Sequence, residues 1–165
     1  MQLSVSDEIL CEIGRITVYQ SHIESELALF IQELLRIAKD GRGDIITVKL
    51  AFNELIRVAG SLLRSEFGDD HEQVKRFDEF SSGANVVLGR RNQFAHSLWG
   101  FGKDLTRNTA TRIKVTEKKQ LVRKDIEFLS LRDLQDISEE MAHLLWLISD
   151  IRVTVCYYEV SARRF

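Results

Sequence analysis

Apolar residues recur at spacings of three and four over four long stretches of the chain, which is the period of an amphipathic helix. The first predicted helix begins near Ser6, a capping residue followed by two acidic residues, and runs to about Lys39, before a glycine-containing loop. The later stretches predict helices over residues 46–67, 71–95 and 130–157, the last capped by Ser130 with Asp133 three residues on.

The period changes to two between the third and fourth predicted helices. Ile113 and Val115 alternate with polar residues, and beyond Lys118 and Lys119 a second run alternates around Ile126. This pattern predicts a two-stranded β-hairpin. The predicted fold class is therefore mainly all-α: an antiparallel four-helix bundle with a β-hairpin inserted between the third and fourth helices.

Composition agrees with a helical chain. The 165 residues include no proline and nine glycines, which favours long uninterrupted helices, and the length suits one domain over residues 1–165. No apolar run approaches the roughly 20 residues of a membrane span, and the N-terminus has no export signal. We therefore expect a cytoplasmic protein without membrane association. Cys11 and Cys156 are expected to be buried thiols and not a disulfide.

The net charge of −2 hides an uneven distribution. Between Arg90 and Lys124 the chain has ten basic and two acidic residues, so this segment is a basic island in an otherwise acidic protein. Either the island forms a surface patch that binds an anionic partner, or its charges spread around a solvated hairpin. Glu24 and Glu26, in the first helix, are expected to be exposed surface charges.

The residues with the most chemistry lie at the end of the third predicted helix. Asn92 and His96 are four apart and share a helix face, and the long side chain of Arg91 can swing toward it. Histidine can exchange a proton near neutral pH, and arginine presents a planar fork that suits phosphate. These groups could cleave RNA without a metal, because a base deprotonates the 2′-hydroxyl, its oxygen attacks phosphorus, and arginine stabilises the negative charge that builds on the phosphate. A histidine that caps the helix end is the structural alternative.

The Arg91, Asn92 and His96 pattern, in a small helical chain, resembles the signature of the HEPN superfamily. The resemblance implies a metal-independent endoribonuclease in which two protomers of a homodimer face each other and build one composite site. Arg91 would clamp the phosphate, His96 would act as acid and base, and Asn92 would orient them. One departure is Leu98, which stands where the toxin half of HEPN–nucleotidyltransferase pairs has a modified tyrosine.

The basic island supplies the residues that we expect to bind RNA: Arg90, Arg112, Lys114, Lys118, Lys119 and Arg123. The chain would belong to a toxin or phage-defence system, with an antitoxin or regulatory partner that the sequence does not identify. Two alternatives remain open: a non-catalytic RNA-binding or dimerising scaffold, and a helical interaction protein in which the motif is a coincidence. No zinc-ligand spacing, phosphate-binding loop or dinucleotide fingerprint is present, so we expect no metal and no cofactor.

Overall fold

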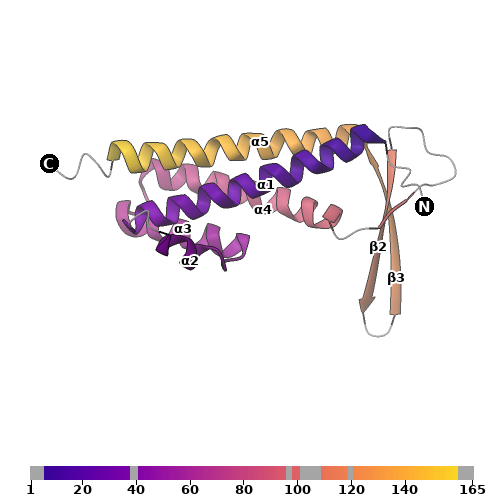
Figure 1. The fold of residues 1–165 in the computed structure, drawn as a ribbon, viewed down its shortest axis with the longest axis horizontal. Helices are drawn as coiled ribbons and strands as arrows, with labels where there is room; N and C mark the ends of the chain where they lie inside the picture. The colour runs from indigo at the N-terminus through magenta and orange to yellow at the C-terminus, as the bar shows by residue number, and fades with distance from the viewer. Residues whose placement is uncertain (1–5, 38–40, 96–97, 101–108, 119–120, 160–165) are drawn as a thin grey trace. The chain divides into compact units, whose positions relative to one another are not determined.

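The computed structural model describes the backbone of residues 6–37, 41–95, 98–100, 109–118 and 121–159, and side chains over 6–37, 41–91 and 130–157. The mainly helical class is confirmed (Figure 1). The helical elements are α1 (Asp7–Leu34), α2 (Arg42–Thr47), α3 (Phe52–Phe67), α4 (Glu72–Ala95), α5 (Leu131–Val153) and the π-helical turn η1 (Thr154–Glu159). The strands are β1 (Leu98–Gly100), β2 (Thr109–Lys118) and β3 (Leu121–Ser130), paired antiparallel in the order β1-β2-β3.

Helix α1 begins as predicted and ends earlier. The Ser6 hydroxyl accepts the N–H of Ile9 at 3.4 Å, which satisfies one of the free donors of the first turn. The helix stops at Leu34 because Arg36 has a φ of 55° and turns the backbone left-handed. The N–H of Ile37 then donates to the carbonyl of Gln32 at 3.0 Å, and that of Arg36 to Glu33 at 3.0 Å. This is a Schellman motif with arginine at the position that glycine usually occupies.

The single helix predicted over residues 46–67 is wrong, because the chain forms α2 and then α3. Ala51 is extended, with φ −66° and ψ 156°, so the helical conformation is interrupted there. The Glu54 carboxylate accepts the N–H of Ala51 at 2.8 Å and gives α3 a start of its own. The apolar period continues across the break, which is why the pattern alone does not show it.

The chain forms two compact units, each built from separated segments. One combines residues 1–18 with 86–141, and the other combines 19–85 with 142–165. No helix in the described ranges has both the length and the apolar character needed to cross a membrane.

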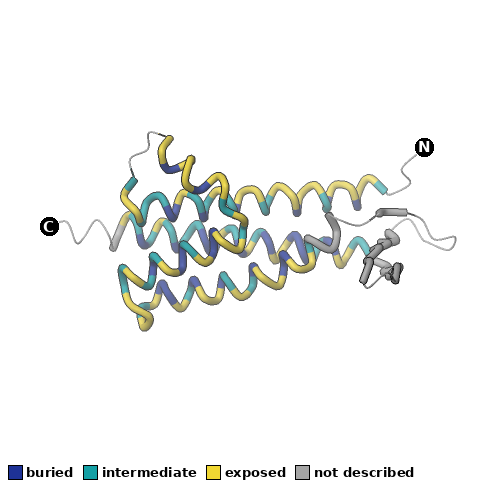
Figure 2. Tube along the Cα trace, turned by 90° about the horizontal axis from the view of Figure 1, so that it is seen from below, coloured by how far each residue is buried: buried dark blue, intermediate teal, exposed yellow. Residues whose placement is uncertain are grey.

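The core of the second unit draws on all four long helices, and Figure 2 shows the buried positions along each of them. Phe77 of α4 lies 6.3 Å from the ring of Phe30 in α1 and 5.6 Å from that of Phe80. Two glycines allow close packing in this unit. A Cβ on Gly60 would lie 3.0 Å from Phe77, and one on Gly83 would lie 3.0 Å from Leu144 of α5. Helix α4 is continuous through Gly83.

The first unit contains a buried polar link between two helices. Glu12 of α1 is only 5% exposed, and its carboxylate accepts the hydroxyl proton of Ser138 in α5 at 2.9 Å. Arg15, one turn further along α1, reaches the same carboxylate at 2.6 Å. A buried carboxylate needs such partners because losing its hydration is costly. This unit also contains the end of α4 and the three strands.

Candidate functional site

The predicted catalytic residues lie at and beyond the end of α4. The helix ends at Ala95, as the apolar pattern predicts, so Arg91 and Asn92 stand in its last turns. Arg91 is half-buried, while Asn92 is placed by its backbone alone. His96 lies outside the described residues. The structure therefore locates two of the three motif residues on one helical turn, and the convergence of all three stays a prediction.

Arg90 is held by an ion pair between helices. Its Nη1 lies 3.4 and 3.3 Å from the two carboxylate oxygens of Glu140 in α5. Both side chains are about half exposed, at 50% and 48%, so the pair adds little to stability, about 0 to 1 kcal/mol. The ion pair has a clear geometric effect, because it directs the Arg90 side chain toward α5. An RNA-binding role for Arg90, which stays a prediction, would require this pair to open or to be shared with phosphate.

The N-terminus of α5 is fixed by the predicted cap. The Ser130 hydroxyl accepts the N–H of Asp133 at 3.1 Å, and the Asp133 carboxylate accepts the N–H and the hydroxyl of Ser130 at 2.8 and 2.7 Å. The hydroxyl and backbone hydrogen bonds from Ser130 lower the pKa of Asp133 below its ordinary 3.8. Partial burial opposes this shift, and the positive charge of Arg90 adds to it. Arg90 therefore acts on two acidic residues of α5.

Arg91 and Arg90 are adjacent in the sequence but lie on different sides of α4. One residue of α-helix is a rotation of about 100°, so the two Cα–Cβ bonds point to different sides of α4. Arg90 is committed to the side of Glu140. A guanidinium on the neighbouring side can bind a phosphate through two parallel hydrogen bonds and stabilise developing negative charge. This chemistry agrees with the role that the motif predicts for Arg91.

The predicted RNA-binding residues of the hairpin fall on strands whose backbone register is defined. Arg112 pairs with Glu127, Lys114 with Asp125, Thr116 with Arg123, and Lys118 with Leu121. Residues directly opposite each other share a face of the sheet, and opposite charges there attract by about 0.2–1 kcal/mol. Two of the four basic positions thus stand across from acids and two do not. Lys119 lies outside the described residues.

The second unit contains an ion-pair cluster that was not predicted from the sequence. Arg152 of α5 bonds Glu26 at 2.8 Å and Glu33 at 3.0 Å, and all three side chains are at most 20% exposed. The prediction that Glu26 is an exposed surface charge is therefore wrong. The available signal was the spacing of seven between Glu26 and Glu33, which places both on one side of α1. Burial lowers the pKa of Arg152, but the hydrogen bonds and negative charges of Glu26 and Glu33 outweigh this effect and raise the pKa above its ordinary value.

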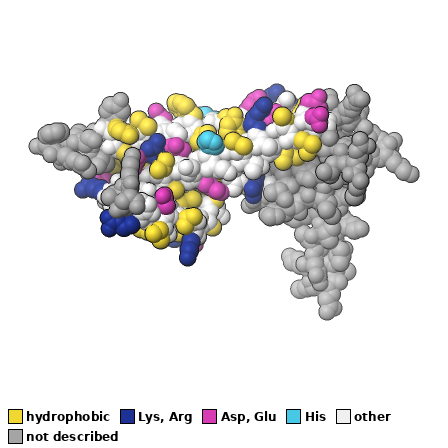
Figure 3. All heavy atoms as spheres, in the orientation of Figure 1, with side chains coloured by type: hydrophobic (Ala, Val, Ile, Leu, Met, Phe, Trp, Pro, Cys, Tyr) yellow, Lys and Arg dark blue, Asp and Glu magenta, His cyan; other side chains and the backbone are white. Residues whose placement is uncertain are grey.

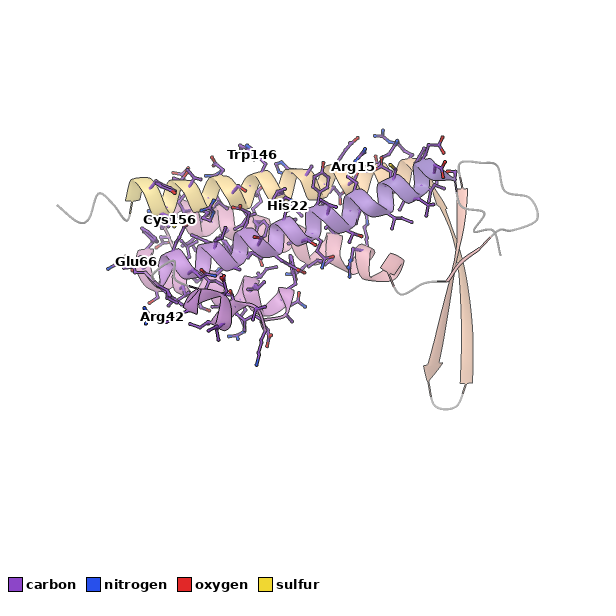
Figure 4. All side chains as sticks on the ribbon, in the orientation of Figure 1. Arg15, His22, Arg42, Glu66, Trp146 and Cys156 are labelled. Carbon is purple, nitrogen blue, oxygen red and sulfur yellow. The ribbon has the colours of Figure 1, made fainter. Side chains whose placement is uncertain are left out.

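Cys156, labelled in Figure 4, lies in η1 and interacts with Glu33 and Arg152 of this cluster. Burial, a hydrogen bond with Glu33 and the negative charge of that residue together raise the pKa of its thiol to about 12, against the opposing effect of Arg152. Neither Cys11 nor Cys156 forms a disulfide, as expected, but Cys11 is exposed and Cys156 only partly buried, so the prediction that both are buried is wrong. Because only the thiolate is a good nucleophile, we expect Cys156 to react slowly at neutral pH.

The remaining described surface offers no second constellation of comparable chemistry. Acidic, basic and hydrophobic side chains are interspersed over the helices on the face shown in Figure 3. Over the described ranges, no three His, Cys, Asp or Glu side chains are grouped so as to hold a metal ion. Comparisons with protein-family models, with curated proteins and with solved structures found no match to this chain. The HEPN resemblance therefore rests on the motif and the helical layout.

Proposed function

We propose that this chain is a metal-independent endoribonuclease of the HEPN type that works as a homodimer. The proposal includes the antiparallel four-helix bundle with its inserted β-hairpin, and a composite site built from Arg91 and His96 of both protomers. Arg91 stabilises the charge on the scissile phosphate, His96 exchanges protons with the 2′-hydroxyl and the leaving oxygen, and Asn92 orients the imidazole. A toxin or phage-defence setting suits such an activity, with an antitoxin or other regulatory partner.

The observation that supports this proposal most is the position of the motif on α4. Arg91 is half-buried in the last turns of the helix, and Arg90 beside it is held by Glu140. A helix end that is tied to a second helix is a rigid support, and catalysis by electrostatic stabilisation needs such preorganisation. The reaction is one transesterification: the 2′-oxygen attacks phosphorus, the bond from phosphorus to the 5′-oxygen breaks, and the products end in a 2′,3′-cyclic phosphate and a 5′-hydroxyl.

The test compares four proteins on one RNA pool in the presence of EDTA. Wild type is expected to cleave and to leave 2′,3′-cyclic phosphate ends. His96→Ala should lose about 10²–10⁴ in rate, as expected when a general acid or base is removed. Arg91→Ala should lose about 10²–10³, as expected for a lost electrostatic contact. Arg132→Ala is the matched control, because Arg132 is 71% exposed and pairs with Asp136 one turn away on the same helix.

Two results would contradict the proposal. Cleavage by His96→Ala at the wild-type rate would remove His96 from the chemistry, and equal losses in Arg91→Ala and Arg132→Ala would indicate a general charge effect. If no protein cleaves any RNA of the pool, the non-catalytic scaffold becomes the better hypothesis. One observation suits that alternative: the ion pair between Arg90 and Glu140 ties α4 to α5 and requires no catalytic role for Arg90.

A further inference from the structure

The register of the three strands separates the basic island into two faces. Successive residues of a strand alternate between faces, and directly paired residues share one. Positions 112, 114, 116 and 118 of β2 therefore lie on the same face as positions 127, 125, 123 and 121 of β3. We call this the charged face, because four of the predicted RNA-binding residues stand on it: Arg112, Lys114, Lys118 and Arg123.

The opposite face, which we call the apolar face, has a different composition. Its paired positions include Ile113 with Ile126, Thr111 with Phe128, and Leu98 of β1 with Ile113. Two charged residues, Lys124 and Glu117, stand on it near the hairpin end. Antiparallel sheets with one apolar and one polar face bury the first and leave the second in water. The charged face thus has the composition of a solvated face.

Strand β1 adds an aromatic residue to the charged face. Trp99 pairs with Arg112, whereas its neighbour Leu98 pairs with Ile113. A packing role for Trp99 would predict a place on the apolar face. A tryptophan position paired with an arginine position, on a face with further basic residues, has the composition of a site that stacks an unpaired base while cations hold the phosphates.

The net positive charge along this face increases with distance from Trp99. Arg112 and Lys114 face Glu127 and Asp125, which offset them, but Arg123 and Lys118 face Thr116 and Leu121. Arg123 is the diagonal neighbour of both Lys114 and Lys118, which are four residues apart on β2, or about 14 Å. A strand of nucleic acid that begins at Trp99 would meet its strongest electrostatic attraction at Lys118 and Arg123.

From this placement we infer that the charged face binds single-stranded RNA, with Trp99 as the stacking platform and Lys118 and Arg123 as the main phosphate contacts. The inference rests on the proposed RNA function and names the form of RNA that the protein takes. A duplex keeps its bases stacked inside the helix and cannot offer one to Trp99, so the face selects unpaired segments.

A fluorescence experiment tests the role of Trp99. The only other tryptophan is Trp146, whose side chain is 59% exposed on α5, so His96→Ala with Trp146→Phe leaves Trp99 as the sole reporter and removes cleavage. A labelled 12-nucleotide oligouridylate is expected to bind and to quench Trp99, and a duplex RNA of equal length is not. Trp99→Ala should weaken oligouridylate binding by about tenfold or more, and Trp99→Phe should retain most of it.

Two adjacent residues provide a matched charge comparison. Arg123 stands on the charged face and Lys124 on the apolar face, and each is changed to glutamine. Arg123→Gln should weaken binding several-fold and lower the slope of log affinity against log salt by about 0.7, the value for one contact to a single strand. Lys124→Gln should change neither. Circular dichroism on each variant verifies that the fold is kept.

The outcomes separate this inference from the proposed function. Equal effects of Arg123→Gln and Lys124→Gln, or binding without any quenching of Trp99, would overturn the charged face as the site. Tighter binding of duplex than of oligouridylate would overturn the single-strand preference. In each of these cases, cleavage by wild type and its loss in His96→Ala would leave the nuclease proposal intact. Absence of RNA binding together with absence of cleavage would reject both.

Discussion

Arg90 and Arg91 are adjacent and chemically identical, and helix α4 turns them about 100° apart. Arg90 meets Glu140, whereas Arg91 is half-buried on another side of the helix. The same separation occurs in β3, where alternation places Arg123 and Lys124 on opposite faces of the sheet. At the residue scale, therefore, the backbone geometry around a basic residue decides its chemistry, and the count of basic residues in a segment does not.

The cap of α5 makes a testable contribution to acid stability. Because the folded pKa of Asp133 lies below its ordinary 3.8, its stabilising contribution is fully present above pH 3.8 and is lost as the pH falls through the folded value. Asp133→Ala is expected to lower the free energy of unfolding by about 0.5–2 kcal/mol at pH 7, the range for a lost cap. Urea unfolding from pH 7 to pH 2.5 should show the two proteins converging in acid. Parallel curves would contradict this role.

The two thiols should differ sharply in reactivity. With a pKa of about 12, only about one Cys156 in 10⁴ is a thiolate at pH 8, whereas Cys11 is exposed. We expect Ellman's reagent to modify one thiol per chain rapidly in the folded protein and two in urea. Cys11→Ser should abolish the rapid phase. Rapid modification that persists in Cys11→Ser would show that Cys156 is accessible.

At the scale of elements, Arg152 links α5 to α1 through two carboxylates that are mostly withdrawn from water. Arg152→Ala is expected to lower the free energy of unfolding by about 3 kcal/mol, because Glu26 and Glu33 lose their partner and repel each other. Arg132→Ala, at the surface pair, should cost less than about 1 kcal/mol. Chemical denaturation of both variants measures these losses. Equal losses in the free energy of unfolding would show that the Arg152 cluster stabilises the fold no more than a surface ion pair does.

Gly83 and Gly14 test the packing between α4 and α5. A Cβ on Gly83 would lie 3.0 Å from Leu144, whereas nothing lies within 4 Å of one on Gly14. Gly14→Ala should raise the free energy of unfolding by about 0.5–1 kcal/mol through helix propensity. Gly83→Ala should gain less, and Gly83→Val should destabilise by about 1–3 kcal/mol because Leu144 must move. Thermal unfolding of the three variants measures these changes. Equal gains in the free energy of unfolding for Gly14→Ala and Gly83→Ala would show that α4 and α5 can move apart at Gly83.

At the scale of the whole molecule, the proposed composite site predicts complementation between inactive chains. Arg91→Ala and His96→Ala homodimers each lack one group on both sides. A mixed dimer has one intact Arg91 and one intact His96, contributed by different chains to the same site. Unfolding and refolding the two proteins together should therefore restore part of the cleavage rate. If the site lay within one chain, the mixture would stay inactive, because neither chain has both groups.

The apolar period determined most of the helical layout from the sequence alone. Helices at residues 71–95 and from Ser130 onward agree with α4 and α5 to within about one residue at their N-terminal ends, because burial of one face imposes a period of 3.6 whatever the partner is. Caps at Ser6 and Ser130 were equally readable, since a hydroxyl satisfies its own helix locally. The motif at the end of α4 was visible for the same reason: it depends on neighbours along one helix.

Only the tertiary structure decided the features that the apolar pattern hides and those that depend on residues far apart in the chain. The left-handed turn at Arg36 and the break before α3 are local, but the apolar pattern runs past both and hides them. The ion pairs of Arg90 and Arg152 join helices separated by 50 or more residues, so no spacing rule predicts them. Strand register likewise set which basic residues share a face with Trp99, because a shift of one residue would move them all to the other side.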